Sequence, residues 1–267
     1  LQRNIAIVYE KQNRNNDAEE IYKELVKTYQ SQKDGNNVMS AIASVAYNQS
    51  QQGEYRKAIT NYQKTIDYYL LVKQWEKAGY NLSQIGQSYW SIGMYDSAIH
   101  SHQKALQYQQ LGENNEYKAY AWGKLGRLYA LSGLQNKAVF AQDSALYYSY
   151  KAKDTMGAIR YLTDMGNTYR EANDDIKALE KFRTAEELSK KIKSKTSLLS
   201  SCYNLAGYFY KKDTAMSARY YKQAAALANE LGDKEKQIYT ALNLGLLQNK
   251  QLKYAASETW FKKAFTI

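Results

Sequence analysis

Four basic side chains near the middle of this 267-residue sequence could together bind an anion. They are Lys124, Arg127, Arg160 and Arg170. A guanidinium group can donate two hydrogen bonds to one carboxylate, and a lysine adds a point charge. These residues are therefore candidates for a site that binds the acidic side chains or the free C-terminal carboxylate of a peptide. The alternative is an ordinary solvated surface, on which they pair with nearby acidic residues such as Asp164.

Amide and aromatic side chains form a second set of candidates. Amides can hydrogen-bond to a peptide backbone, and aromatic rings offer flat apolar contact. The set consists of Tyr80, Gln84, Gln87, Tyr120, Asn167, Asn204 and Asn243. Together with the basic residues, it predicts recognition of a protein or peptide.

Catalytic and metal-binding motifs are missing from the sequence, which has no glycine-rich phosphate loop, HExxH helix or nucleophile elbow. His100 and His102 are two residues apart, so a helix would direct them to different faces and not to one ion. We expect His102 to pack in the core. Cys202, the single cysteine, permits no internal disulfide and is expected to be a buried, inert thiol. We therefore predict no enzymatic activity, no cofactor and no metal site.

The composition is basic, with a formal net charge of +11 and an isoelectric point near 9.3. Such a charge suits nucleic acid, an anionic membrane or an acidic peptide, although a lysine-rich solvated surface explains it more simply. The basic run at residues 190–195 has no interleaved aromatic residues, so nucleic acid is not the expected partner. No run of 18 apolar residues occurs, so no membrane span is expected.

Helices must position the candidate residues, because proline is absent and apolar residues recur every three or four positions. One skeleton repeats along the chain with a period of forty residues. Its clearest copy has Trp122, Leu125, Gly126 and Tyr129, followed by Ala138. The place of Gly126 recurs at positions 6, 46, 86, 126, 166, 206 and 245, so one step is short by a residue. The short step is expected in the turn at residues 211–214.

Each repeat is predicted to be a helical hairpin. A small residue at the place of Gly126 would let the second helix approach the first closely. Gly53, Gly93 and Gly133 stand where the first helix must end, since glycine adopts the left-handed conformation of a helix terminus easily. One hairpin cannot bury its own apolar face, so the hairpins are expected to stack.

This skeleton resembles the tetratricopeptide repeat (TPR) over nearly the whole chain. The resemblance implies an all-α, right-handed superhelical solenoid of about seven repeats, with first helices on its concave wall. The repeats would form one array that is truncated at both ends, spanning residues 1–38, 39–78, 79–118, 119–158, 159–198, 199–237 and 238–267. Both sets of candidates would then lie on the concave wall, with Lys124, Arg127, Arg160 and Arg170 on adjoining helices. The sequence does not reproduce the full carboxylate clamp of some TPR domains.

Repeats of this length without proline are similar to two groups of TPR proteins. The first implies a protein- or peptide-binding scaffold, the sensor or interaction region of a bacterial signalling or transcription regulator, in the extracytoplasmic (periplasmic) part of a membrane-anchored protein. The alternative is a free-standing cytoplasmic peptide-binding adaptor or pheromone-type receptor. Exposed faces on the terminal repeats would act as caps, form a homodimer or reflect the truncation, and the sequence leaves these alternatives open.

Overall fold

The computed structural model describes residues 1–267 and is built from fourteen α-helices without strands. The helices are α1 (Gln2–Lys11), α2 (Asn15–Ser31), α3 (Gly35–Gln51), α4 (Tyr55–Leu71), α5 (Trp75–Ser91), α6 (Tyr95–Gln109), α7 (Asn115–Leu131), α8 (Gln135–Lys151), α9 (Thr155–Glu171), α10 (Asp175–Lys191), α11 (Lys195–Phe209), α12 (Thr214–Leu231), α13 (Lys234–Lys250) and α14 (Tyr254–Thr266).

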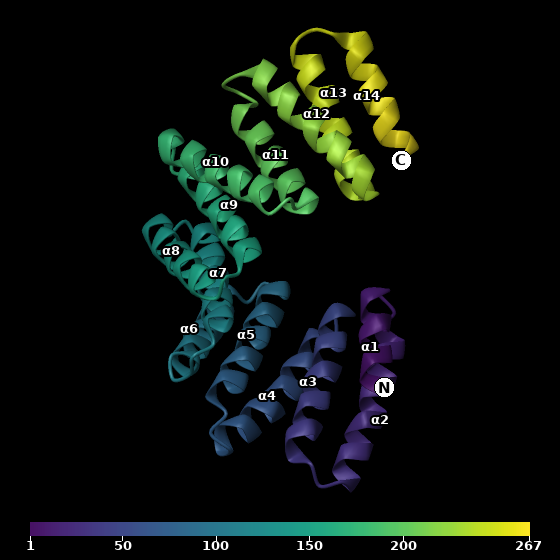
Figure 1. Ribbon diagram of the computed structural model, residues 1–267, viewed down its shortest axis with the longest axis vertical. Helices are drawn as coiled ribbons and strands as arrows, with labels where there is room; N and C mark the ends of the chain where they lie inside the picture. Colours follow the sequence, from purple (N-terminus) through teal and green to yellow (C-terminus); the bar gives the residue numbers. More distant parts are fainter. The chain divides into compact units, whose positions relative to one another are not determined.

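Successive helices pair into helical hairpins, namely α1/α2, α3/α4, α5/α6, α9/α10, α11/α12 and α13/α14 (Figure 1). The chain forms two compact units, Leu1–Leu128 and Tyr129–Ile267, whose boundary falls within α7. In the first unit each helix from α1 to α5 packs against the next, and α3 also contacts α5. In the second unit helices α8 to α14 pack in the same way, and α9 also contacts α11. The expectations of an all-α solenoid fold and of seven repeats are confirmed.

Left-handed turns end most helices and give the chain a regular spacing. Helices α2 to α11 begin every twenty residues, from position 15 to position 195. At the end of α3, the Glu54 N–H donates to the Gln49 carbonyl at 2.8 Å and the Gly53 N–H donates to the Ser50 carbonyl at 3.2 Å, which is a Schellman motif. The positive φ that this motif requires is supplied, as predicted, by Gly53, Gly93 and Gly133.

Close approach of the two helices within a hairpin depends on the small residue of the skeleton. A Cβ atom added to Gly86 would lie 2.8 Å from Nε2 of His102, and one added to Gly166 would lie 2.6 Å from Cε1 of Phe182. Both separations are far inside van der Waals contact, so a larger residue at either glycine would displace the ring that packs on it from the second helix. The predicted role of this position is confirmed.

Repeat six contains the predicted short step. Helix α12 begins at Thr214, nineteen residues after α11 begins at Lys195. The Asp213 carboxylate caps α12 by accepting a hydrogen bond from the Met216 N–H at 2.9 Å. Downstream of this turn the packing register is restored, and the buried positions of α12 include Ser217, Tyr221 and Ala224, as predicted.

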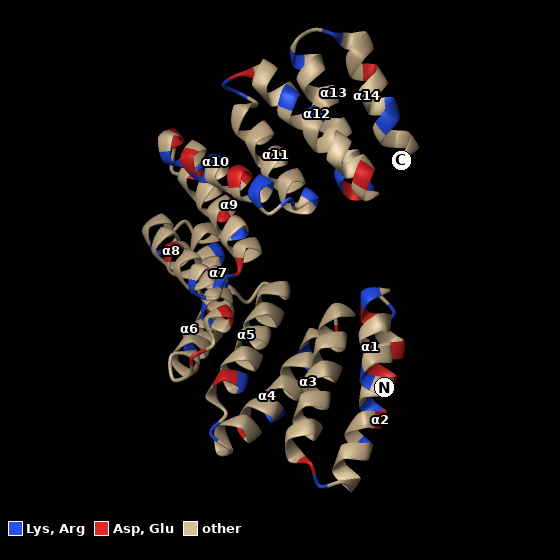
Figure 2. Cartoon of the chain, viewed as in Figure 1, with Lys and Arg blue, Asp and Glu red and all other residues tan.

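The charge of the chain is spread over its helices. Figure 2 shows basic and acidic residues interspersed, for example along α2 and α10. None of the helices combines the length and the apolar character that a membrane span needs.

Candidate functional site

A cavity of about 520 Å³ in the first unit is lined by five of the predicted residues. Tyr80, Gln84 and Gln87 come from α5, and Tyr120 and Lys124 come from α7. Residues three or four apart share one face of a helix, which explains why these side chains line the same space. The rest of the lining is also polar or aromatic: Tyr47, Ser50, Gln51, Tyr55 and Ser91. We call this space the amide cavity.

Lys124 is positioned in the amide cavity by its neighbours. Its Nζ donates a hydrogen bond to Oε1 of Gln87 and lies 5.2 Å from the ring centroid of Tyr120. It also lies 5.6 Å from the Trp90 ring centroid, and the Arg127 guanidinium lies 4.9 Å from the same centroid. Cation–π contacts stabilise such arrangements by about 0.5–1 kcal/mol each at exposed sites. Two predicted basic residues therefore share one indole ring, and one of them lines the cavity.

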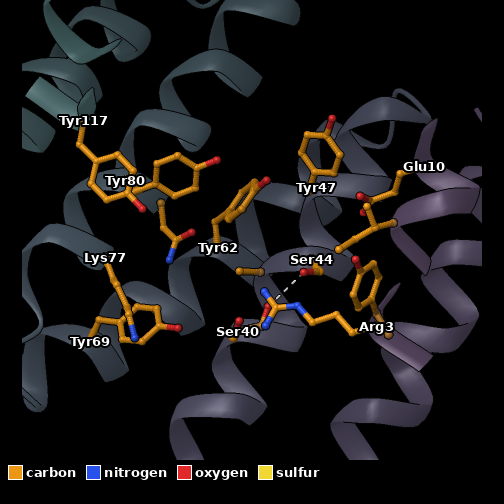
Figure 3. Close-up of a pocket in the computed structure, with 14 residues that line it drawn as sticks. Arg3, Glu10, Ser40, Ser44, Tyr47, Tyr62, Tyr69, Lys77, Tyr80 and Tyr117 are labelled. Atoms are coloured by element: carbon orange, nitrogen blue, oxygen red, sulfur yellow. Dashed lines mark hydrogen bonds between the residues drawn. The ribbon is translucent and has the colours of Figure 1, made fainter. Parts of the chain in front are cut away.

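A second cavity, of about 430 Å³, shares Tyr47 and Tyr80 with the amide cavity. Figure 3 shows Tyr69, Lys77 and Tyr117 toward one end of this space, and Arg3 and Glu10 toward the other. We call it the tyrosine cavity because six tyrosines line it: Tyr22, Tyr47, Tyr62, Tyr69, Tyr80 and Tyr117.

The tyrosine cavity is lined by neutral hydroxyls and a few charges. Burial is the main cause that raises the pKa of five of its tyrosines, namely Tyr22, Tyr62, Tyr69, Tyr80 and Tyr117. Their hydroxyls therefore stay protonated at neutral pH and can both donate and accept hydrogen bonds. The Glu10 carboxylate accepts a hydrogen bond from Nδ2 of Asn48 at 2.9 Å, and Nζ of Lys77 lies 5.3 Å from the Tyr69 ring centroid. With Arg3 included, two cations and one carboxylate line this cavity.

Predicted residues of the second unit lie on its first helices, where they make local contacts. Nη2 of Arg160 donates to the Tyr161 hydroxyl at 3.1 Å, and Nδ2 of Asn204 donates to the Ser200 carbonyl at 2.8 Å. Asn243 links two first helices, because its Nδ2 donates to the hydroxyl of Tyr203 at 3.1 Å.

The remaining two, Asn167 and Arg170, are half-buried on α9. Lys124 and Arg127 belong to the first unit, whereas Arg160 and Arg170 belong to the second. An anion site shared by these four residues stays a prediction.

His102 and Cys202, both expected in the core, are buried. His102 has no exposed surface, and burial, followed by the charge of Lys124, lowers its pKa to about 3. Cys202 is also fully buried, and burial raises the pKa of its thiol to about 12. The imidazole and the thiol are therefore uncharged at neutral pH, and neither lines a cavity described above.

Several lining residues were not among the predicted site residues. Tyr22 and Tyr62 occupy the packing position that holds His102 in repeat three, and their rings are buried as that position requires. A phenol is longer than a histidine or phenylalanine ring, so its hydroxyl must extend beyond the core to reach polar surroundings. A tyrosine at this packing position is therefore the feature of the sequence that could have predicted a lining residue. Arg3, Lys77 and Tyr117 carry no such signal in the sequence.

Comparisons with known proteins identify the class of fold. No protein-family model and no curated protein matches this chain. The apo form of RapI superposes with a TM-score of 0.75 at 15% identity, covering 98% of this chain and 74% of RapI. A Rap conjugation gene regulator of a plasmid, solved in complex with the Phr* peptide, gives 0.67 at 13% identity and covers 99% of this chain and 72% of the regulator.

TPR-like repeats of a kinesin light chain from Podospora anserina give a TM-score of 0.58 at 13% identity, covering 72% of this chain and 95% of that protein. Likeness at such identities concerns the fold. It agrees with the forty-residue skeleton, the fourteen helices and the close contacts at the skeleton glycines Gly86, Gly166 and Gly245. The chain is therefore, in its fold, a TPR-type helical repeat protein.

Proposed function

We propose that the chain binds peptides or short protein segments through the first-helix surface of its first unit. The observation that carries this proposal is that five predicted residues line the amide cavity, which shares Tyr47 and Tyr80 with the tyrosine cavity. Amides and hydroxyls there can bind a peptide backbone, and the rings can contact its side chains. The structural likeness to a Rap regulator in complex with the Phr* peptide supports this class of ligand.

The ligand is acidic, or it offers a free carboxylate. Lys124 lines the amide cavity, and Arg3 and Lys77 line the tyrosine cavity, whereas Glu10 is the one carboxylate among the lining residues of the two cavities. A peptide carboxylate would gain charge-assisted hydrogen bonds from these cations. We propose the basic residues of the second unit, Arg160 and Arg170, as further contacts for a longer partner.

The biological role that we propose is the sensor or interaction region of a bacterial signalling or transcription regulator. A free-standing cytoplasmic peptide-binding adaptor or pheromone-type receptor is the alternative. In either role, a ligand changes the output only if it binds one conformation of the repeats more tightly than another. The proposal includes no catalytic step. The pKa values of His102 and Cys202 are strongly shifted by burial, but neither side chain lines either cavity.

Panning of the 267-residue chain against random peptides tests the proposal, with the affinity of selected peptides measured by calorimetry. The double variant Gln84→Ala and Lys124→Ala should weaken binding by at least about tenfold, since each change removes a lining polar group. The matched control is Lys104→Ala with Gln107→Ala, two exposed residues on α6 of the same unit. Failure to select any peptide, or equal weakening by both double variants, would refute a peptide site in the amide cavity.

A further inference from the structure

Asn81 is an unsatisfied hydrogen-bonding residue in the lining of the tyrosine cavity. The residue is 3% exposed, and its Oδ1 has no hydrogen-bond partner. A buried amide oxygen without a donor is destabilising, so such an atom beside a cavity calls for a ligand that brings an N–H or O–H group. The equivalent positions forty residues away hold Ala41 and Ala121, which are also buried. The repeat packing therefore does not require an asparagine here.

Aromatic rings around Asn81 favour a flat side chain. The ring centroids of Tyr80 and Tyr117 are 4.9 Å apart with an interplanar angle of 34°, and Tyr62 and Tyr69 add further buried rings to the lining. Aromatic pairs gain energy beyond area burial when rings stack offset or meet edge to face. The volume of about 430 Å³ lies in the range of ligand pockets, so one large side chain and part of its backbone fit.

Charge selects against a cationic ligand group. Arg3 and Lys77 line the cavity, and the single lining carboxylate, Glu10, already accepts a hydrogen bond from Asn48. An arginine or lysine side chain would add a third positive charge. Tryptophan and tyrosine side chains are flat, uncharged and carry a donor at the ring edge, whereas phenylalanine has no donor.

We propose that the tyrosine cavity anchors a peptide by one tryptophan or tyrosine side chain, whose N–H or O–H group donates a hydrogen bond to Oδ1 of Asn81. This anchor rests on the proposed peptide-binding function and specifies the side chain recognised. Selectivity arises because a phenylalanine leaves the buried oxygen unpaired, and a site built around such a group rejects the analogue that lacks the donor.

The test uses five pools of biotinylated heptapeptides, each random at six positions with tryptophan, tyrosine, phenylalanine, leucine or arginine fixed at the centre. Retention of each pool by the 267-residue chain is measured at equilibrium. We expect the tryptophan or tyrosine pool to be retained about tenfold better than the phenylalanine pool. In Asn81→Ala this preference should disappear while retention of the phenylalanine pool is kept. Alanine is already the residue at the equivalent positions 41 and 121, and a thermal melt checks that the variant folds.

The control is Asn16→Ala, which removes an exposed asparagine from α2 of the same unit and should leave the preference intact. Equal retention of all five pools would overturn the anchor but keep peptide binding. A tryptophan or tyrosine preference that survives in Asn81→Ala would also overturn the assignment to this cavity. Retention of no pool would overturn the peptide-binding function, and the anchor with it.

Discussion

His102 occupies a packing position where the other repeats place an aromatic ring or an amide. Its counterparts are Tyr22, Tyr62, Gln142, Phe182, Tyr221 and Phe261. Phe182 and Phe261 meet the skeleton glycines Gly166 and Gly245 as His102 meets Gly86. Neither ring nitrogen of His102 has a hydrogen-bond partner, although the ring is fully buried. The imidazole therefore fills the space of the aromatic ring, but it leaves two buried nitrogen atoms without hydrogen bonds.

Replacement of His102 by phenylalanine should stabilise the protein and change its pH dependence. Removing the buried unpaired nitrogens gains about 1–3 kcal/mol. The unfolded histidine has a pKa near 6.5, and burial lowers the folded value to about 3. The unfolded state therefore binds more protons between these values, and stability falls as the pH falls below about 6.5. The wild type should lose about 1 kcal/mol more per pH unit than His102→Phe between pH 6 and pH 5, as measured by urea unfolding.

The control for this experiment is His100→Gln, since His100 is exposed on the same helix. It should leave both the stability at neutral pH and the slope with pH close to those of the wild type. Parallel pH profiles for the wild type and His102→Phe would contradict a buried neutral imidazole.

At the scale of the element, helix termini show how much of the fold the sequence predicts. The skeleton identifies the buried small residues and the glycines of three turns, because glycine reports positive φ directly. The same conformation at Asn13, Lys33, Lys73, Lys153, Asn173, Lys193 and Leu252 carries little sequence signal. Non-glycine residues adopt it at a cost, which the two hydrogen bonds of the helix terminus offset. The spacing of twenty residues between helix starts is therefore regular in the structure, although the residue types at the turns do not repeat with that period.

The candidate site divides in the same way. Residues of the amide cavity were predicted because helical spacing places Tyr80, Gln84 and Gln87 on one face. The residues that second helices add to the tyrosine cavity, such as Tyr62 and Tyr69, were not predicted. Their buried rings fit the apolar pattern of the core, and that pattern says nothing about where their hydroxyls lie. Spacing specifies which face a residue occupies, whereas a cavity depends on how far each side chain reaches.

Two opposite changes at helix termini test the cost of positive φ. Gly53→Ala should destabilise the protein by about 1 kcal/mol, because φ is +81° there and an added Cβ meets nothing within 4 Å, which leaves backbone strain as the only penalty. Leu252→Gly should stabilise it by about 0.5–1 kcal/mol, because Leu252 has φ +59° and is 72% exposed, so little burial is lost. Thermal unfolding measures both, and changes of the same sign would contradict the argument.

At the scale of the whole molecule, both cavities lie within the unit Leu1–Leu128. Repeat arrays gain stability from each repeat and from its contacts with neighbours, so a ligand stabilises the repeats that it contacts more than distant ones. The tyrosine cavity takes residues from helices α1 to α5 and α7, and the amide cavity from α3, α4, α5 and α7. A bound peptide should therefore act mainly on the first unit.

Amide hydrogen exchange should reveal this localisation once a peptide has been selected. At a free peptide concentration of about 100 Kd, binding stabilises the liganded unit by about 2.7 kcal/mol, so exchange through its opening should slow by about a hundredfold. We expect this slowing in helices α3 to α5 and a much smaller one in α9 to α12, with mass spectrometry of peptic fragments as the readout. The variant Gln84→Ala with Lys124→Ala should reduce the slowing at the same peptide concentration. Stronger slowing in α9 to α12 than in α3 to α5 would place the site in the second unit, where Arg160 and Arg170 lie, and would contradict a ligand seated in the two cavities.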